Sequence, residues 1–406
     1  MIQEITGGIC AVNGVKAFGI KDGKKGLAII TAKGNAAGVY TRNKVIAAPL
    51  IVTKERMTAG GGILEAVIAN SGNANAFTGE QGLDDANEMA NVLAEKLGID
   101  KNHIAVASTG VIGRKLHIDK IKEQIDIVLP NLESSEKAND ETRKAIMTTD
   151  LVPKDFAVEV KTAAGNFRIG GIAKGSGMIE PNMGTMLSFI YTDIEISNEM
   201  LENAFRIVVE KTFNMIVVDG DTSTNDICLI TATGKSGTAV SKDDEIYKEF
   251  KEALETVMKE LAKMIARDGE GATKLIECTV AGALTKDDAA TAAKSIVRSP
   301  LVKTAIFGRD PNWGRIVAAA GYSGADFDQT KISLALSDGE NIVNLVDRGI
   351  ITKNDEATLA ALKEVMAAKT IYIHMDLDAG ISENTATAWG CDLTYDYVKI
   401  NADYTT

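Results

Sequence analysis

One stretch of the chain reads Lys174-Gly-Ser-Gly-Met-Ile-Glu-Pro-Asn-Met-Gly-Thr-Met-Leu-Ser-Phe-Ile-Tyr-Thr-Asp193. Its first half has the composition of a loop, because two glycines and Pro181 interrupt regular structure. Its second half, residues 186–192, is apolar, aromatic and β-branched, which predicts a buried strand. Gly184 and Thr185 therefore stand where the predicted loop meets the predicted strand.

The pair Gly184-Thr185 has the residue types that backbone self-cleavage requires. Gly184 has no Cβ, so its peptide reaches conformations closed to other residues, and the Thr185 hydroxyl can attack the preceding carbonyl. Hydrolysis of the resulting ester would make Thr185 a new N-terminus. Its free α-amine would have a pKa of about 7.7–8.0 and would serve as a base beside the hydroxyl nucleophile. The simpler interpretation is a glycine-rich turn before a core strand.

The bulk properties predict a cytoplasmic protein of two domains, or of one large domain with a smaller lobe. The chain has 406 residues and a net charge of −12, and no basic stripe suggests nucleic acid or an anionic membrane as main partners. It shows no membrane-length apolar run and no secretory signal. Four widely spaced cysteines and three histidines without ligand spacing indicate buried thiols and no metal site; the cysteines are Cys10, Cys228, Cys278 and Cys391.

Hydrophobic periodicity predicts alternating strands and helices along the rest of the chain. Helices are expected at 84–97, at 197–211 and, as the longest, at 243–267. Other expected elements are strands at 27–30, 50–53 and 66–70, a hairpin at 156–161 and 167–172, a strand–helix–strand unit at 274–281, 286–298 and 304–307, and a final strand or strand pair at 385–400.

Several polar loops are candidates for binding or catalysis. Thr109 and Gly110 follow a predicted strand, where a hydroxyl residue and a glycine can present hydrogen-bond donors to an oxyanion. Glu270 lies between two glycines and is predicted to be exposed, either as part of a helix cap or as a carboxylate for a substrate amine. The amide-rich segment 70–82 either lines a polar pocket or is a plain connection.

Two apparent motifs lack residues that their functions require at set positions. The acidic loop Asp219-Gly-Asp-Thr-Ser-Thr-Asn-Asp226 suggests calcium, but it lacks the glycine and glutamate that a calcium loop needs at its sixth and twelfth positions. Gly234-Lys235-Ser236 resembles the end of a phosphate loop, but Leu229 stands where that loop needs glycine.

Taken in order, the longer motifs resemble the ornithine acetyltransferase family of arginine biosynthesis, also called bifunctional glutamate N-acetyltransferase. The resemblance covers essentially the whole chain. The motifs that carry it are Asn70-Ser-Gly-Asn-Ala-Asn-Ala76, Ser108-Thr-Gly-Val-Ile-Gly113, Met147-Thr-Thr-Asp150, Lys174-Gly-Ser-Gly-Met-Ile179 with Pro181-Asn-Met-Gly-Thr-Met-Leu187, Asp219 to Asp226, Asp268-Gly-Glu-Gly-Ala-Thr-Lys274, Gly308-Arg-Asp-Pro-Asn-Trp-Gly-Arg315 and Asn401-Ala-Asp-Tyr-Thr-Thr406.

The resemblance implies a mixed α/β fold of the N-terminal-nucleophile type, with helices layered around mixed sheets and a smaller C-terminal lobe. It implies self-cleavage at Gly184-Thr185 into an α chain, 1–184, and a β chain, 185–406, which stay together in a heterotetramer of two α and two β chains. Residues 185–275 would complete the main domain, 276–390 would form the lobe, and 391–406 would return to the active site. Many members have alanine where this chain has Gly184, and both residues are small.

The resemblance also implies the roles of individual residues. Thr185 would be the nucleophile, and Thr109 with Gly110 the oxyanion hole. N-acetylornithine and glutamate, the implied substrates, need fixed charges to bind, and Lys174 and Glu270 can supply them. The family needs no cofactor, and acetyl-CoA is a second acetyl donor for some members. The implied substrate contacts are Thr148, Lys174, Thr185, Glu270, Asn401 and Thr406.

Two other functions are compatible with parts of this pattern. An N-terminal-nucleophile aminopeptidase or amidase would pass the acyl group to water, and an assay of acetyl transfer to glutamate against hydrolysis separates it from a transferase. A non-catalytic protein that binds acetylated amino acids would be favoured by an uncleaved chain on a denaturing gel.

Overall fold

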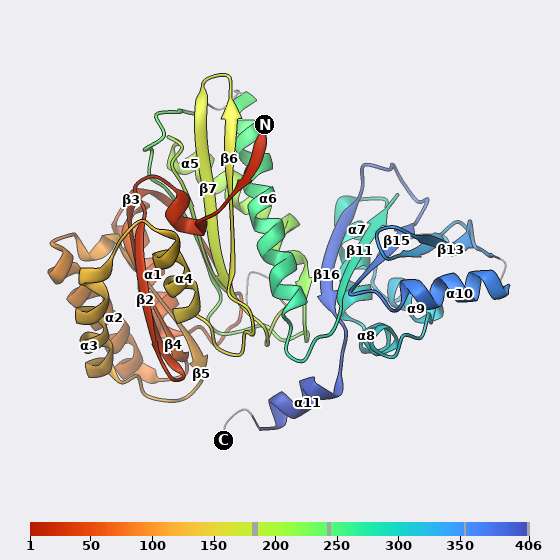
Figure 1. The fold of residues 1–406 in the computed structure, drawn as a ribbon, viewed down its shortest axis with the longest axis horizontal. Coiled ribbons are helices and arrows are strands. Elements are labelled where there is room, and N and C mark those ends of the chain that lie inside the picture. Colours follow the sequence, from red (N-terminus) through yellow and green to blue (C-terminus); the bar gives the residue numbers. More distant parts are fainter. Residues whose placement is uncertain (181–185, 242–244, 353–354, 404–406) are drawn as a thin grey trace. The chain divides into compact units, whose positions relative to one another are not determined.

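A computed structural model describes residues 1–180, 186–241, 245–352 and 355–403 (Figure 1). The chain divides into two compact units, and each is a mixed α/β structure, which confirms the predicted fold class. The first unit comprises Met1–Gly175, Pro181–Asn214 and Thr222–Leu261; the second comprises Ser176–Glu180, Met215–Asp221 and Ala262–Thr406.

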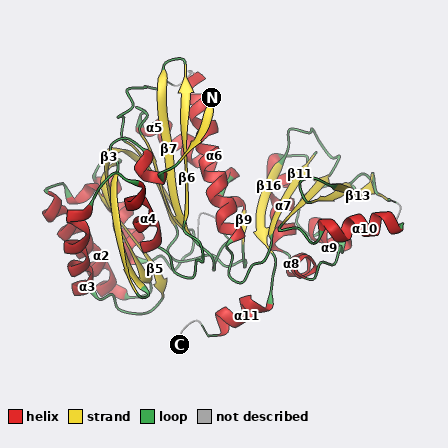
Figure 2. Cartoon of the chain, in the orientation of Figure 1, coloured by secondary structure: helices red, strands yellow, loops and turns green. Residues whose placement is uncertain are grey.

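The first unit is built on a nine-stranded mixed sheet (Figure 2). Its strand order is β1-β6-β7-β8-β10-β3-β4-β5, with β2 paired to β3. The predicted strand after the loop is β8, all of whose residues are buried, and the predicted hairpin is β6 and β7. The strands are β1 (Ile2–Ile5), β2 (Lys16–Asp22), β3 (Lys25–Tyr40), β4 (Ile63–Asn73), β5 (Ile104–Val111), β6 (Lys154–Thr162), β7 (Gly165–Lys174), β8 (Leu187–Thr192) and β10 (Ile227–Ala232).

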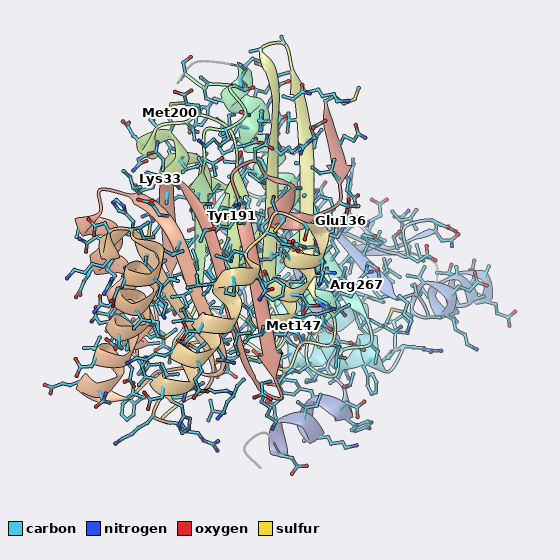
Figure 3. All side chains as sticks on the ribbon, turned by 60° about the vertical axis from the view of Figure 1, so that its left-hand side comes forward. Lys33, Glu136, Met147, Tyr191, Met200 and Arg267 are labelled. Atoms are coloured by element: carbon cyan, nitrogen blue, oxygen red, sulfur yellow. The ribbon has the colours of Figure 1, made fainter. Side chains whose placement is uncertain are left out.

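The long strand β3 connects the two halves of this sheet. Its first part pairs with β4 and its last part with β10, and the register with β4 shifts between Thr31 and Gly34. One core cluster contains both Ala107 of β5 and Ile172 of β7, which stand far apart in the strand order. Tyr191 of β8 is buried in the same cluster (Figure 3). The sheet therefore curls around this core and brings distant strands together.

Helices cover the sheet because side chains alternate between its two faces. Leu27 and Ile29 of β3 belong to the cluster shared with α2 and α3, whereas Ala28 and Ile30 face the inner cluster with α4. The predicted strand at 50–53 is wrong, because a helix with Pro49 in its first turn runs through these residues. A short apolar run fits either structure. The helices are α1 (Ala48–Ala59), α2 (Gly79–Leu97), α3 (Ile118–Val128), α4 (Glu136–Ala145), α5 (Asn198–Lys211) and α6 (Glu245–Arg267), which continues into the second unit.

The second unit contains a seven-stranded mixed sheet in the order β14-β13-β12-β15-β11-β16-β9. The predicted strand at 304–307 is helix α8, where the Ser299 side chain accepts the Val302 N–H and Pro300 takes the first position. The predicted final strand is correct only for β16, because Thr394 caps a helix after it. The elements are β9 (Ile216–Val217), β11 (Leu275–Ala281), α7 (Lys286–Arg298), α8 (Pro300–Phe307), α9 (Trp313–Gly321), β12 (Ser333–Ser337), β13 (Ile342–Asp347), β14 (Ile350–Ile351), α10 (Glu356–Val365), β15 (Thr370–Asp376), β16 (Ala386–Cys391) and α11 (Tyr395–Ala402).

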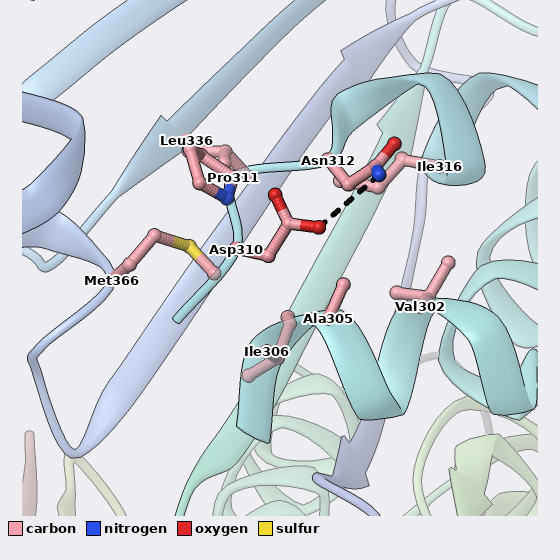
Figure 4. Close-up of a pocket in the computed structure, with 9 residues that line it drawn as sticks. All are labelled: Val302, Ala305, Ile306, Asp310, Pro311, Asn312, Ile316, Leu336 and Met366. Carbon is pink, nitrogen blue, oxygen red and sulfur yellow. Dashed lines mark hydrogen bonds between the residues drawn. The ribbon is translucent and has the colours of Figure 1, made fainter. Parts of the chain in front are cut away.

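The motif Gly308–Arg315 closes a small cavity in the second unit (Figure 4). Asp310 and Asn312 lie at its edge, joined by a hydrogen bond of 3.2 Å from Asn312 Nδ2 to Asp310 Oδ2. The cavity is about 10 Å³, which holds at most one water molecule. Leu336 of β12 and Ile306 of α8 line it, so packing of α8 against the sheet explains this motif.

Candidate active site

The predicted site residues fall into three groups. Thr109, Gly110, Thr148 and Lys174 belong to the first unit, whereas Glu270 and Asn401 belong to the second. Gly184, Thr185 and Thr406 lie outside the described residues, so the predictions about them stay predictions.

The end of β5 holds Thr109 and Gly110 in fixed positions. β5 runs parallel to β4, and Gly110 pairs with Gly72. A Cβ on Gly110 would lie 2.3 Å from the Gly72 carbonyl carbon, and its φ of 134° also favours glycine. Asn225 Nδ2 donates to the carbonyl oxygen of Ser108 at 2.9 Å and anchors the residue before Thr109. Such a rigid strand end suits an oxyanion hole, whose donors must be in place before charge develops.

Lys174 joins this strand end from the opposite side of the curled sheet. Its Nζ donates to Thr109 Oγ1 at 3.1 Å, and the lysine is 7% exposed. Lys174 is the last residue of β7 and pairs with Leu187, the first residue of β8. The fold thus brings three of the predicted residues, Thr109, Gly110 and Lys174, to the edge of the sheet where β8 begins.

Asp150 links Lys174 to Thr148, and its chemical role was not predicted from the sequence. Its carboxylate accepts hydrogen bonds from the N–H groups of Thr148, at 3.0 Å, and Gly175, at 2.7 Å. It also pairs with Lys154 Nζ at 2.8 Å, and both side chains are almost fully buried. Burial alone would raise the pKa of Asp150, but the charges of Lys174 and Lys154 hold it well below its usual value. Asp150 is therefore an anion at neutral pH beside two predicted substrate-binding residues.

Glu270 is buried in the second unit, with only 7% of its surface exposed, so the prediction of an exposed loop is wrong. Asn401 Nδ2 of α11 donates to its Oε2 at 2.8 Å, which brings two predicted site residues together. The Glu270 N–H donates to the carbonyl oxygen of Ser176 at 2.9 Å. Gly177 lies directly against the carboxylate, because a Cβ there would be 2.3 Å from Glu270 Cδ. The two glycines that flank Glu270 in the sequence did not indicate that Gly177 would bury its carboxylate.

The segment Ser176–Glu180, which precedes the predicted cleavage site, is held in place within the second unit. Asp219 accepts the N–H groups of Met178, at 2.6 Å, and Ile179, at 2.7 Å. Glu180 pairs with Arg298 Nε at 2.9 Å. The first aspartate of the acidic loop therefore binds backbone N–H groups.

No group of three or more metal-ligating side chains occurs in the part of the chain that the structure describes. No described helix has the length and apolar character to cross a membrane.

Replacing Gly177 with alanine should displace the Glu270 carboxylate, since the new Cβ would overlap it. If Glu270 binds the substrate amine, the KM should rise by about tenfold or more, because one lost buried polar contact costs about 1–3 kcal/mol. Steady-state kinetics measure this effect. Gly321→Ala is the matched control, because its Cβ would meet no atom within 4 Å. An unchanged KM in Gly177→Ala would remove Glu270 from the substrate contacts.

Comparison with known proteins gives consistent matches over the whole length of the chain. The ArgJ family model matches residues 12–406. The protein named glutamate N-acetyltransferase from Methanosarcina mazei is 57% identical over 405 residues, all of both chains. The arginine biosynthesis bifunctional protein ArgJ from Archaeoglobus fulgidus is 47% identical and covers 98% of this chain and all of its own. The crystal structure of the arginine biosynthesis bifunctional protein ArgJ from Bacillus halodurans is 44% identical, with a TM-score of 0.51, and covers 54% of this chain and 100% of its own.

Proposed function

The chain belongs to the ArgJ family and is an N-acetyltransferase, and we propose that it moves the acetyl group of N2-acetylornithine to glutamate in arginine biosynthesis. The observation that carries this proposal is the contact between Lys174 Nζ and Thr109 Oγ1. It places a fixed positive charge beside a hydroxyl group and a glycine at a rigid strand end. A small substrate that has both a carboxylate and a reacting carbonyl group needs this combination.

The proposal includes self-cleavage at Gly184-Thr185 into residues 1–184 and 185–406. The residue types support it, as does the anchored segment Ser176–Glu180 just before the junction. A further support is that 54% of this chain accounts for the full length of the solved Bacillus halodurans chain, a share similar to that of residues 185–406. We extend the proposal to a cytoplasmic heterotetramer of two fragments of each kind that works without a cofactor.

In the proposed reaction Thr185 carries the acetyl group between the two amino acids. Its hydroxyl proton passes to its own α-amine while the oxygen attacks the acetyl carbonyl, and Thr109 and Gly110 donate to the oxyanion. Collapse breaks the amide bond, and ornithine leaves with the proton from the α-ammonium group. The glutamate amine then attacks the acetyl ester, gives up its proton through the same amine, and restores the Thr185 hydroxyl.

Substrate binding is divided between fixed charges of opposite sign. The ammonium group of Lys174 takes a substrate carboxylate, and its own charge is balanced by Asp150. The Glu270 carboxylate takes a substrate amine and is oriented by Asn401. Thr148 and Thr406 complete the proposed contacts. Both substrates are amino acids, so one set of charges serves donor and acceptor in turn.

Initial-rate kinetics test the function and the order of steps. With N-acetylornithine varied at several fixed glutamate concentrations, we expect parallel double-reciprocal lines, because one nucleophile serves two substrates in turn. Intersecting lines would indicate direct transfer in a ternary complex. Release of acetate without N-acetylglutamate would indicate the amidase alternative instead. Replacing N-acetylornithine by acetyl-CoA in the same assay determines whether the enzyme uses a second donor.

A further inference from the structure

Asp226, the last residue of the acidic loop, is held at the point where β8 begins. The residue is 3% exposed, and its carbonyl oxygen accepts the Thr41 N–H at 2.9 Å. The next residue, Ile227, donates its N–H to the carbonyl oxygen of Met186 at 3.0 Å. The Met186 N–H favours the ionised form of the Asp226 carboxyl group. This carboxyl group therefore lies near the amide of the residue that directly follows the proposed nucleophile.

One oxygen of this carboxyl group, Oδ2, is buried and has no hydrogen-bond partner among the described residues. Asp193, a comparable buried aspartate of the first unit, differs in this respect. Its two oxygens accept the N–H groups of Arg168, at 2.7 Å, and Asn13, at 3.4 Å. An unsatisfied buried oxygen costs free energy, so aspartates that serve structure alone are normally satisfied as Asp193 is. The unsatisfied oxygen of Asp226 points to a role beyond packing.

Lys174 lies near two carboxyl groups whose environments differ. Leu187 of β8 pairs with Lys174 on one side and with Ile227, the residue after Asp226, on the other. Asp150 accepts the N–H of Gly175, the residue after Lys174. Asp150 accepts three hydrogen bonds, and its pKa is held well below the usual value. For Asp226, burial raises the pKa well above the usual value, and the charge of Lys174 offsets this only in part. Two carboxyl groups with pKa values pushed apart take different roles. Asp150 is the constant anion, and Asp226 is the group that can gain and lose a proton.

We propose that Asp226 is a positioning residue of the acetyl-transfer site that serves as the protonatable counter-ion of Lys174. The inference rests on the proposed function, in which the Lys174 ammonium group binds a substrate carboxylate. Ionised Asp226 favours the charged form of Lys174, and protonation of Asp226 withdraws that support. The other charged groups around Lys174 are Asp150, Lys154 beyond it, and Lys21, whose pKa is lowered by burial.

The pH dependence of kcat/KM in Asp226→Asn tests this role. Asparagine keeps an oxygen for the Met186 N–H but carries no charge. In the wild type, the negative charge of Asp226 at alkaline pH favours the charged form of Lys174. Without it, the alkaline limb of the profile should move to lower pH by about one unit or more, the usual effect of one nearby charge. Protonation of the proposed α-amine base gives both proteins an acid limb, and only the further loss of activity that the wild type owes to protonation of Asp226 should disappear.

Asp193→Asn is the matched control, since it removes an equally buried carboxyl group that does not act on Lys174. It should lower stability without moving either limb, which is what a purely structural role would do. Asp226→Glu should retain both limbs. If the wild type transfers acetyl groups and the pH profile of Asp226→Asn superimposes on the wild-type profile, the inference is wrong and the proposed function stands. If wild type transfers no acetyl group to glutamate, the proposed function is wrong.

Infrared difference spectroscopy gives a readout that does not depend on activity. The carboxyl band lost in Asp226→Asn should titrate above the ordinary range of aspartate. In Lys174→Met, which leaves Asp226 in place, the same band should titrate at still higher pH because its neighbouring cation is gone. A band that titrates in the ordinary range, or one that Lys174→Met leaves unmoved, would overturn the assignment even if Asp226→Asn does not fold.

Discussion

Replacing Thr185 with alanine should abolish both self-cleavage and acetyl transfer. The same hydroxyl group attacks the Gly184 carbonyl during maturation and the substrate acetyl group afterwards, and alanine has no oxygen for either step. Loss of a catalytic nucleophile lowers kcat by about 10⁴–10⁶-fold in well-studied hydrolases. Intact-mass measurement should show two fragments, 1–184 and 185–406, for the wild type and one full-length chain for the variant.

Two further variants separate the role of the hydroxyl group from a general disturbance of β8. Thr185→Ser keeps a hydroxyl group and should still cleave and transfer. Thr192→Val changes a buried threonine at the far end of the same strand, whose hydroxyl donates to the Arg168 carbonyl oxygen at 2.8 Å. It should cost stability while cleavage remains complete. An active wild-type preparation that consists only of full-length chain would rule out Thr185 as a processed N-terminal nucleophile.

Sequence patterns predicted the fold wherever local composition leaves one choice. The strand β8 and the hairpin of β6 and β7 have β-branched and apolar runs with clear turn residues between them. The errors at 50–53 and 304–307 concern apolar runs too short to show a period. In both, a proline in the first turn of the helix was the available signal, with Pro49 at the second helical position and Pro300 at the first.

The site was predictable only as separate residues. Thr109 and Lys174 are far apart in sequence, and their contact depends on how the sheet curls along β3. Asp150 and Asp226 stand in motifs that the sequence made visible, but their chemistry arises from burial and from a shared neighbour, Lys174. Glu270 is covered by a glycine segment almost a hundred positions earlier, and local composition carries no information about such a contact.

Asp150→Asn should produce the second large effect, on stability as well as on transfer. Lys154 is 1% exposed on its side chain and pairs with Asp150 at 2.8 Å, so the variant removes a carboxylate that pairs with a buried cation. Breaking a buried ion pair from one side costs about 3–5 kcal/mol. The asparagine amide would also face the N–H of Thr148 or Gly175, two donors that now bind the carboxylate. In the variant, both the free energy of unfolding of the first unit and the rate of acetyl transfer should therefore decrease.

The stabilising effect of Asp150 should decrease as the pH falls. The pKa of Asp150 is lower in the folded protein than in the unfolded chain, where it is about 4. Its stabilising contribution is thus fully present above that pH and is lost as the pH falls below about 4 towards the folded pKa. The free energies of unfolding of wild type and variant in urea should differ most at neutral pH and converge in acid.

Asp140→Asn is the control, because Asp140 pairs with Lys144 and Arg143 at the surface and such pairs contribute at most about 1 kcal/mol. If Asp150→Asn unfolds at the wild-type urea concentration at neutral pH, the Asp150 carboxylate does not stabilise the buried charge of Lys154.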